Sequence, residues 1–216
     1  MRLKLFSQRS RSQEADISEA LTLSHQVLVG THHKTGTAWM RNIFESICRN
    51  HHLLFYVGHH HQAPEKFDVF LQNHSVFDLE EIEQPYKGLH IIRDPRDIVV
   101  SGCFYHQKSD EPWLHLPRQK FGGLTYQAKI NSYDSMDDRL MFEMENSGFH
   151  TIHEILGWEY SNSNFVEVKY EDLIQDINLL LFHQIFTFLG FPGSSIPEIL
   201  KIDYNHSLLS GQLEST

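Results

Sequence analysis

The sequence predicts an α/β fold in which helices flank a central parallel sheet, and three observations carry this prediction. Short apolar runs typical of buried strands alternate along the chain with amphipathic stretches typical of helices. A turn rich in Gly, Thr and Lys follows the first run, and a well-defined helix start follows a later one. Such alternation favours parallel strands joined by helices. Strands are expected over 26–30, 53–57, 68–72, 88–93 and 164–170, and helices over 37–50, 95–106, 136–146, 149–160 and 176–190.

Length and composition fit a single domain. The chain has 216 residues, of which 40% are hydrophobic, so 1–216 can form one core, with residues 1–20 as a polar, flexible start. No apolar run approaches the ~20 residues of a membrane span, and the start lacks the apolar centre of a signal peptide. Two cysteines suit a reducing compartment, so we expect a cytoplasmic protein in which Cys48 and Cys103 serve packing.

Charge and histidine content narrow the class of ligand. A net charge of −10 argues against nucleic-acid binding, although local charge can still hold a small anion. The sixteen histidines, with clusters at 32–33, 51–52 and 59–61, invite a metal-site interpretation. Neighbouring histidines rarely point the same way, however, and no H-E-x-x-H or Cys/His ligand pattern is present. We therefore expect these histidines in solvated loops, and no metal site.

The turn after the first strand is typical of loops that bind phosphate. Residues 30–39 read GTHHKTGTAW, and Gly36 lets the backbone approach an oxyanion just before a helix whose first N–H groups are unpaired. Lys34 supplies the only full charge, and Thr35 and Thr37 supply hydroxyl donors. In G-x-x-x-x-G-K-[ST] the lysine follows a glycine, whereas here it precedes Gly36 by two positions. This favours a P-loop-type, three-layer fold and sulfuryl rather than phosphoryl transfer; a simple chain reversal is the alternative.

The second informative segment begins where the fourth predicted strand ends. Arg93 closes that strand, Asp94 is suited to cap the next helix and Pro95 to its first position. Ligands gather at the carboxyl ends of parallel strands, where a guanidinium can bind a phosphate through two hydrogen bonds. Arg93 is therefore a candidate phosphate ligand. The structural alternative is an ion pair with Asp94 or Asp97.

The acceptor side is less defined by sequence. Residues 108–126 form the longest irregular segment, which can be a lid over the site or an inert surface loop. Aromatic side chains can line an apolar acceptor pocket or belong to the core. The candidates are Phe55, Tyr56, Phe67, Phe104, Tyr105 and Trp113.

Together these segments resemble the sulfotransferases that use 3′-phosphoadenosine 5′-phosphosulfate (PAPS), over nearly the whole chain. In that family a loop of the form x-x-x-K-[ST]-G-[ST]-x-W binds the 5′-phosphosulfate, and residues 32–39 match it. The family's arginine and serine that contact the 3′-phosphate are matched by Arg93 and Ser101, and its tyrosine near the adenine by Tyr170 in VKYEDL. The resemblance thus implies a PAPS site made of Lys34, Thr35, Gly36, Thr37, Ala38, Trp39, Arg93, Ser101 and Tyr170.

The resemblance also implies the catalytic residues. The family's general base is a histidine after the strand that precedes the arginine segment, and His74 has that place here. His74 would take the acceptor's proton while Lys34 stabilises the leaving group, without a metal. A small-molecule or carbohydrate hydroxyl, or an amine, would be the acceptor. A family lysine two positions before the histidine is replaced by Gln72.

A second departure keeps two other functions open. Related chains continue past the His206-Ser207 region into an R-K-G-x-x-G-D-W-K-like segment that closes over the 3′-phosphate, whereas this sequence ends at Thr216 without it. We therefore expect weaker donor binding, because several charge-assisted hydrogen bonds are lost. One alternative is a non-catalytic nucleotide-binding relative. The other is a P-loop small-molecule kinase, which the position of Lys34 disfavours.

Overall fold

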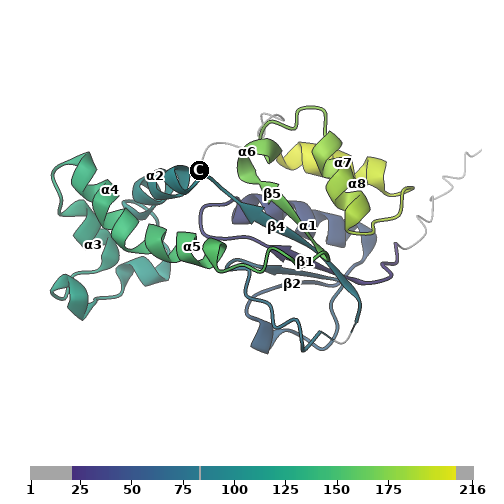
Figure 1. The fold of residues 1–216 in the computed structure, drawn as a ribbon, viewed down its shortest axis with the longest axis horizontal. Coiled ribbons are helices and arrows are strands. Elements are labelled where there is room, and N and C mark those ends of the chain that lie inside the picture. Colours follow the sequence, from purple (N-terminus) through teal and green to yellow (C-terminus); the bar gives the residue numbers. More distant parts are fainter. Residues whose placement is uncertain (1–20, 83, 208–216) are drawn as a thin grey trace, which may run out of the picture.

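The structure, a computed structural model, describes residues 21–82 and 84–207 (Figure 1). The expectations for residues 1–20 and for the chain beyond residue 207 fall outside the described part. Five strands form one sheet in the order β2-β3-β1-β4-β5, and all neighbours are parallel. The strands are β1 (Gln26–Gly30), β2 (Phe55–Val57), β3 (Val69–Gln72), β4 (Tyr86–Ile92) and β5 (Phe165–Lys169). The predicted α/β fold with a parallel sheet and flanking helices is confirmed.

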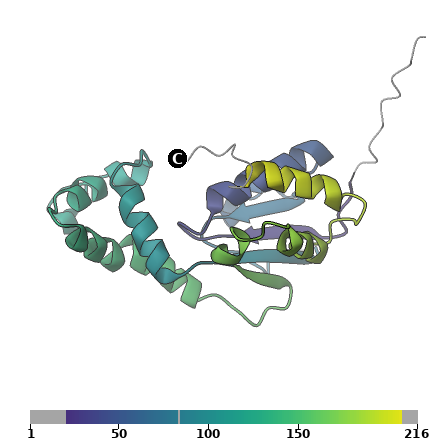
Figure 2. The same cartoon turned by 90° about the horizontal axis from the view of Figure 1, so that it is seen from above.

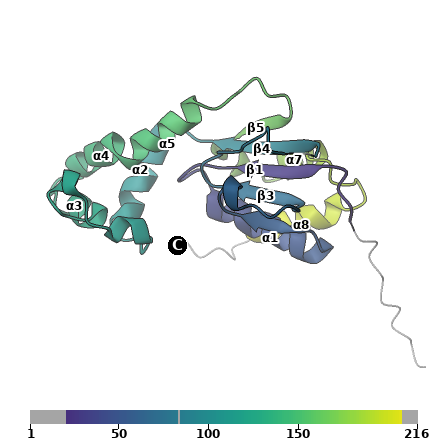
Figure 3. The ribbon, with the colours of Figure 1, turned by 90° about the horizontal axis from the view of Figure 1, so that it is seen from below.

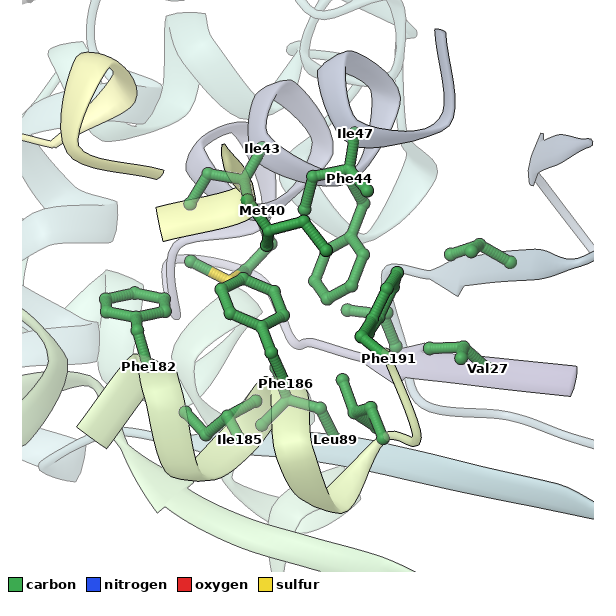
Figure 4. Packing of buried hydrophobic residues seen from close by; sticks show 14 of the residues in the cluster. Val27, Met40, Ile43, Phe44, Ile47, Leu89, Phe182, Ile185, Phe186 and Phe191 are labelled. Atoms are coloured by element: carbon green, nitrogen blue, oxygen red, sulfur yellow. The ribbon is translucent and has the colours of Figure 1, made fainter. Parts of the chain in front are cut away.

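Helices cover one face of this sheet. They are α1 (Thr37–His51), α7 (Leu180–Phe188) and α8 (Ile196–His206). Figure 4 shows Met40 and Phe44 of α1 facing Phe186 of α7 above Val27 and Leu89 of the strands, and all five side chains are buried. Burying each large apolar side chain stabilises the fold by about 1.5–3 kcal/mol. This cluster fixes α1, and hence the loop before it, against β1.

The opposite face is covered by irregular chain. Leu28 and Phe70 alternate with the residues just described and pack with Phe165 in a separate cluster. Loop side chains such as Phe77 and Trp158 surround this cluster. A single turn of 3₁₀-helix, η1 (His60–Gln62), lies between β2 and β3 in the chain.

Further short elements build a helical lobe (residues 95–156). It contains α2 (Pro95–His106), η2 (Pro112–His115), η3 (Gln119–Phe121), α3 (Tyr126–Asn131), α4 (Met136–Glu145) and α5 (Ser147–Leu156). Views from above and below show it projecting past one end of the sheet (Figures 2 and 3). It has its own core, made by Cys103, Leu114, Tyr126, Ile130 and Phe142. Cys48 and Cys103 are both free and buried, as packing residues are expected to be.

The sequence-based boundaries need several corrections. Helix α3, helix α8 and the short α6 (Tyr170–Leu173) were not predicted. The last predicted helix, α7, begins at residue 180 rather than 176, because Leu179 has a left-handed backbone (φ 56°) that interrupts the turn before it. Helix α5 ends before Gly157, four residues earlier than predicted. Within the described residues, no helix is long and apolar enough to span a bilayer.

Candidate active site

The carboxyl ends of β1, β3, β4 and β5 bring the predicted site residues to one edge of the sheet. The loop after β1 holds a strained backbone, with φ of 65° at Lys34 and 98° at Gly36. Thr35 Oγ1 accepts from the His32 amide at 2.8 Å and donates to the His32 carbonyl at 3.0 Å. Thr37 Oγ1 donates to the same carbonyl at 3.1 Å. The two threonines thus brace the loop from within.

Gly36 fits a position that other residues would strain. It lies at the start of α1, where no side chain caps the helix. A Cβ at Gly36 would lie 3.2 Å from two ring carbons of Tyr170, in addition to the cost of its left-handed backbone. The uncapped N–H groups of the first turn of α1 match the predicted binding of an anion.

Lys34 and Arg93 meet at this loop. Arg93 Nη1 donates to the Lys34 carbonyl at 2.7 Å, and the guanidinium lies 4.3 Å from the centroid of the Tyr170 ring. The Lys34 ammonium lies 3.6 Å from the centroid of Tyr105, and burial lowers the pKa of Lys34. Asp94 pairs with Arg96 at 2.6 Å, so the alternative ion pair between Arg93 and Asp94 is not formed among the described residues.

The remaining predicted donor ligands lie on α1, on α2 and at the end of β5. Trp39 lies edge-on to Tyr170, with ring centroids 6.2 Å apart, and also packs against Phe182 of the core. Its buried Nε1 has no hydrogen-bond partner among the described residues. Ala38 is exposed in the first turn of α1, and Ser101 is half-buried two turns into α2.

These groups fit the anionic donor that the sequence predicts. The site offers the Lys34 ammonium, the Arg93 guanidinium and the N–H groups at the start of a helix. The buried Nε atom of Arg93 also has no partner within the described residues. A ligand rich in oxyanions is the kind of molecule that such donors bind.

His74 follows β3 and is hydrogen bonded to a carboxylate that sequence reasoning missed. Its Nδ1 lies 3.1 Å from both oxygens of Glu154 on α5, and this contact raises the pKa of His74. Burial raises the pKa of Glu154, but hydrogen bonds from His32 and His74 outweigh it and lower that pKa to about 2. Glu154 is eighty residues from His74 and belongs to no recognisable motif. Only the fold could reveal the pair.

The turn that carries His74 is tied to the anion loop. The Thr31 amide donates to the Gln72 carbonyl at 3.0 Å, and Ser75 Oγ donates to the Thr31 carbonyl at 3.0 Å. Gln72, which replaces the family's lysine, accepts from the His74 amide through its side-chain oxygen. His74 is therefore held beside the loop by backbone contacts.

A buried histidine pair corrects the expectation of solvated histidines. His32 is 1% exposed, and its Nε2 lies 2.8 Å from Nε2 of His90 in β4. His90 Nδ1 contacts Glu167 at 2.5 Å, and His32 Nδ1 contacts Glu154 at 3.4 Å. Burial lowers the pKa of His32, although its hydrogen bond with Glu154 acts in the opposite direction. His51 is also buried.

A second histidine pair lies under the helical lobe. His33 Nε2 is 2.7 Å from Nε2 of His106, whose Nδ1 lies 2.8 Å from Glu143. Tyr126 donates to the same carboxylate at 2.9 Å. Burial, followed by the neighbouring His106, lowers the pKa of His33 to about 4, so His33 is neutral near pH 7. Among the described residues, no three His, Cys, Asp or Glu side chains are grouped to hold a metal ion.

His33 and His74, together with Glu154, border one cavity of about 480 Å³ between the sheet and the helical lobe. Its walls are His33, Asn73, His74, Glu111, Pro112, Trp113, Arg118, Lys120, Tyr126, Asn146, Ser147, His150, Thr151 and Glu154.

The segment 108–126 therefore borders the cavity and is not an inert surface loop. Of the aromatic side chains suggested for an acceptor pocket, only Trp113 lines this cavity. Tyr105 lies beneath Lys34, and Phe104 is 52% exposed. Phe55, Tyr56 and Phe67 pack against the sheet clusters instead.

Comparisons with known proteins agree with this geometry. Residues 24–209 match the family model described as a sulfotransferase domain. No curated protein matches the chain. Among solved structures, the chain is similar to mouse sulfotransferase SULT7A1 complexed with PAP, with a TM-score of 0.58 and 17% identity. That match covers 90% of this chain and 68% of the mouse chain, and it supports the fold.

Proposed function

Because the chain belongs to the sulfotransferase family, which uses PAPS as its donor, we propose that it moves the sulfuryl group of PAPS to an acceptor hydroxyl or amine in the cavity. The observation that carries this proposal is the hydrogen-bonded contact between the anion loop and the turn of His74. It keeps the loop that we propose to bind the donor beside the histidine that we propose as proton acceptor, at the carboxyl edge of the sheet. The buried free cysteines suit the cytoplasm as its location.

His74 acts as the general base in this proposal. Its Nδ1–H donates to Glu154, which leaves the Nε2 lone pair free to take the acceptor's proton. The acceptor oxygen then forms a bond to sulfur while the bond from sulfur to the 5′-phosphate oxygen breaks. Lys34 stabilises the charge that develops on that oxygen, and the N–H groups of the loop hold the phosphate in line. Arg93, Ser101, Trp39 and Tyr170 bind the remainder of the nucleotide.

Transfer of radiolabelled sulfate from PAPS to a panel of phenols, alcohols, sugars and amines tests the activity. Lys34→Ala should abolish transfer and weaken binding of adenosine 3′,5′-bisphosphate. His74→Ala should slow transfer by ~10²–10⁴-fold and leave that binding nearly unchanged. His59→Ala, an exposed histidine outside the cavity, is the matched control. Equal loss of bisphosphate affinity in the Lys34 and His74 variants would contradict the assigned roles.

The same titrations separate the two alternatives. Preference for ATP with Mg²⁺ over the bisphosphate would indicate a kinase. Bisphosphate binding without transfer to any acceptor would indicate a non-catalytic relative. The displaced Lys34 favours the sulfotransferase over the kinase, because it matches the family loop at residues 32–39.

A further inference from the structure

Helix α5 gives the cavity two distinct ends. Near its C-terminus, Glu154 contacts His74, which marks the end where the proposed reaction takes place. Near its N-terminus, Asn146 and Ser147 line the other end. Ser147 and Glu154 are seven residues apart, so a helical rise of 1.5 Å per residue places these ends ~10 Å apart.

Two cations line the end remote from His74. Lys120 Nζ donates to Asn146 Oδ1 at 3.0 Å, and Arg118 Nη2 donates to the Trp113 carbonyl at 3.4 Å. Both partners are neutral, and neither cation forms an ion pair with any carboxylate in the described part of the chain. The Arg118 guanidinium also lies 5.4 Å from the ring centroid of Trp113 and 5.7 Å from that of Tyr126. These rings hold Arg118 in place beside the cavity.

The carboxylates of the cavity wall are already engaged elsewhere. Glu111 accepts from the Tyr105 hydroxyl at 3.0 Å and from the Trp113 indole at 2.5 Å. Glu154 is occupied by His74 and His32. The positive charge at the remote end is therefore not compensated within the wall, although the chain as a whole carries a net charge of −10. A local pair of unpaired cations in an acidic protein is a site for an anion.

We infer that the acceptor carries an anionic group, a carboxylate or a sulfate or phosphate ester, ~10 Å from the group that receives the sulfuryl moiety, and that Arg118 and Lys120 bind it. This inference rests on the proposed function, because it takes the end at His74 as the reactive end. Both cations touch the non-reacting part of the acceptor, so they determine specificity and do not take part in the transfer.

Matched synthetic ligands test the inference in place of the natural acceptor. Hydroxybiphenyl carboxylate is a rigid phenol with hydroxyl and carboxylate at opposite ends, and its carboxamide is the neutral counterpart. Calorimetry on protein saturated with adenosine 3′,5′-bisphosphate should show about tenfold or tighter binding of the carboxylate. Lys120→Gln and Arg118→Gln should each remove most of that preference. Lys108→Gln, which neutralises an exposed lysine outside the cavity, should retain it.

The outcomes separate this inference from the proposed function. Equal binding of the two ligands, or binding of neither, would overturn the anionic acceptor, even if sulfuryl transfer to neutral acceptors is observed. A preference for the carboxylate that survives both substitutions would also overturn it, because another group would then bind the anion. Absence of all transfer, combined with a preference that depends on Lys120, would reject only the enzymatic function.

Discussion

At the scale of single residues, the contact between His74 and Glu154 makes the activity depend on pH in a defined direction. The base must be neutral, so kcat/KM rises as pH increases through the His74 pKa, which Glu154 holds above its ordinary value of 6.5. Glu154→Gln removes the carboxylate and should move this acid limb to lower pH while reducing kcat. Profiles of kcat/KM against pH for both proteins measure the shift.

A control variant and an alternative base, His33, allow this prediction to be tested against other outcomes. Glu145→Gln removes an exposed carboxylate from α4 and should leave the profile unchanged. If His33 were the base, its pKa of about 4 would place the acid limb near that pH. A limb near pH 4 that Glu154→Gln does not move would therefore reject His74 as the base.

Arg93 yields a second prediction at this scale. Arg93→Ala should weaken binding of adenosine 3′,5′-bisphosphate by about 10- to 100-fold, because a charge-assisted contact to the 3′-phosphate is worth ~1.5–3 kcal/mol. Binding of adenosine 5′-phosphate should weaken less. Arg96→Ala is the control, because the Arg96 side chain is 89% exposed and pairs with Asp94. Calorimetric titration of both nucleotides measures the difference, and identical losses would make Arg93 purely structural.

The loop residues proposed to bind the donor could be suggested by sequence because they are local in the chain. Lys34 and Gly36 lie between β1 and α1, and Trp39 lies in the first turn of α1, so their spacing carries the signal. Glu154 and Arg118 could not be found in this way, since they reach the cavity only through packing of the helical lobe. The histidines at 32, 33 and 51 were misjudged for the same reason: the residues that they contact come from distant elements, namely His90, His106 and Glu198.

At the scale of elements, the junction between the anion loop and α1 depends on glycine. Gly36→Ala should destabilise the fold by ~1–2 kcal/mol from its left-handed backbone, and further through contact with the Tyr170 ring. Gly123→Ala is a matched control, because its φ is also positive (89°) and no atom lies near its Cβ position. Thermal unfolding of both variants should show a larger loss for Gly36→Ala. Equal losses would mean that the Tyr170 ring moves aside freely.

The comparison of predicted and observed elements shows which sequence patterns predict a strand or helix and which do not. All five strands lie close to their predicted ranges. The inner strands β1 and β3 are almost fully buried and form continuous apolar runs, whereas the edge strands β2 and β5 are only partly buried. Helix α3 was missed because it spans only six residues inside an irregular segment. Helix α8 was missed because Pro197 near its start suggests a break, although proline is well tolerated in a first turn.

At the scale of the whole molecule, a buried acid on α8 should make global stability depend on pH. Asp203 is fully buried, its carboxylate has no hydrogen-bond partner among the described residues, and burial followed by Asp176 raises its pKa to about 8. The unfolded chain ionises this group at its ordinary pKa of 3.8. The folded state thus holds an extra proton between these values, so this group makes the free energy of unfolding fall as pH rises from about 4 to about 8.

Asp203→Asn should remove this dependence. The variant should gain much more stability relative to the parent at pH 8 than at pH 5, as measured by denaturant unfolding at both values. Asp172→Asn removes an exposed carboxylate of α6 and serves as the control. Its stability relative to the parent should be the same at pH 5 and pH 8. A loss of stability at pH 8 in Asp203→Asn would show that the ionised form is stabilised in the folded protein.

The part of the chain that supplies the cavity wall affects how acceptor specificity can change in such an enzyme. Apart from His33, Asn73 and His74, every residue of the wall comes from one uninterrupted stretch, 111–154, inserted between β4 and β5. The residues that we propose to bind the nucleotide all lie outside that stretch. Substitutions confined to residues 111–154 can therefore change which molecules are modified, while the residues proposed to bind the sulfuryl donor remain the same.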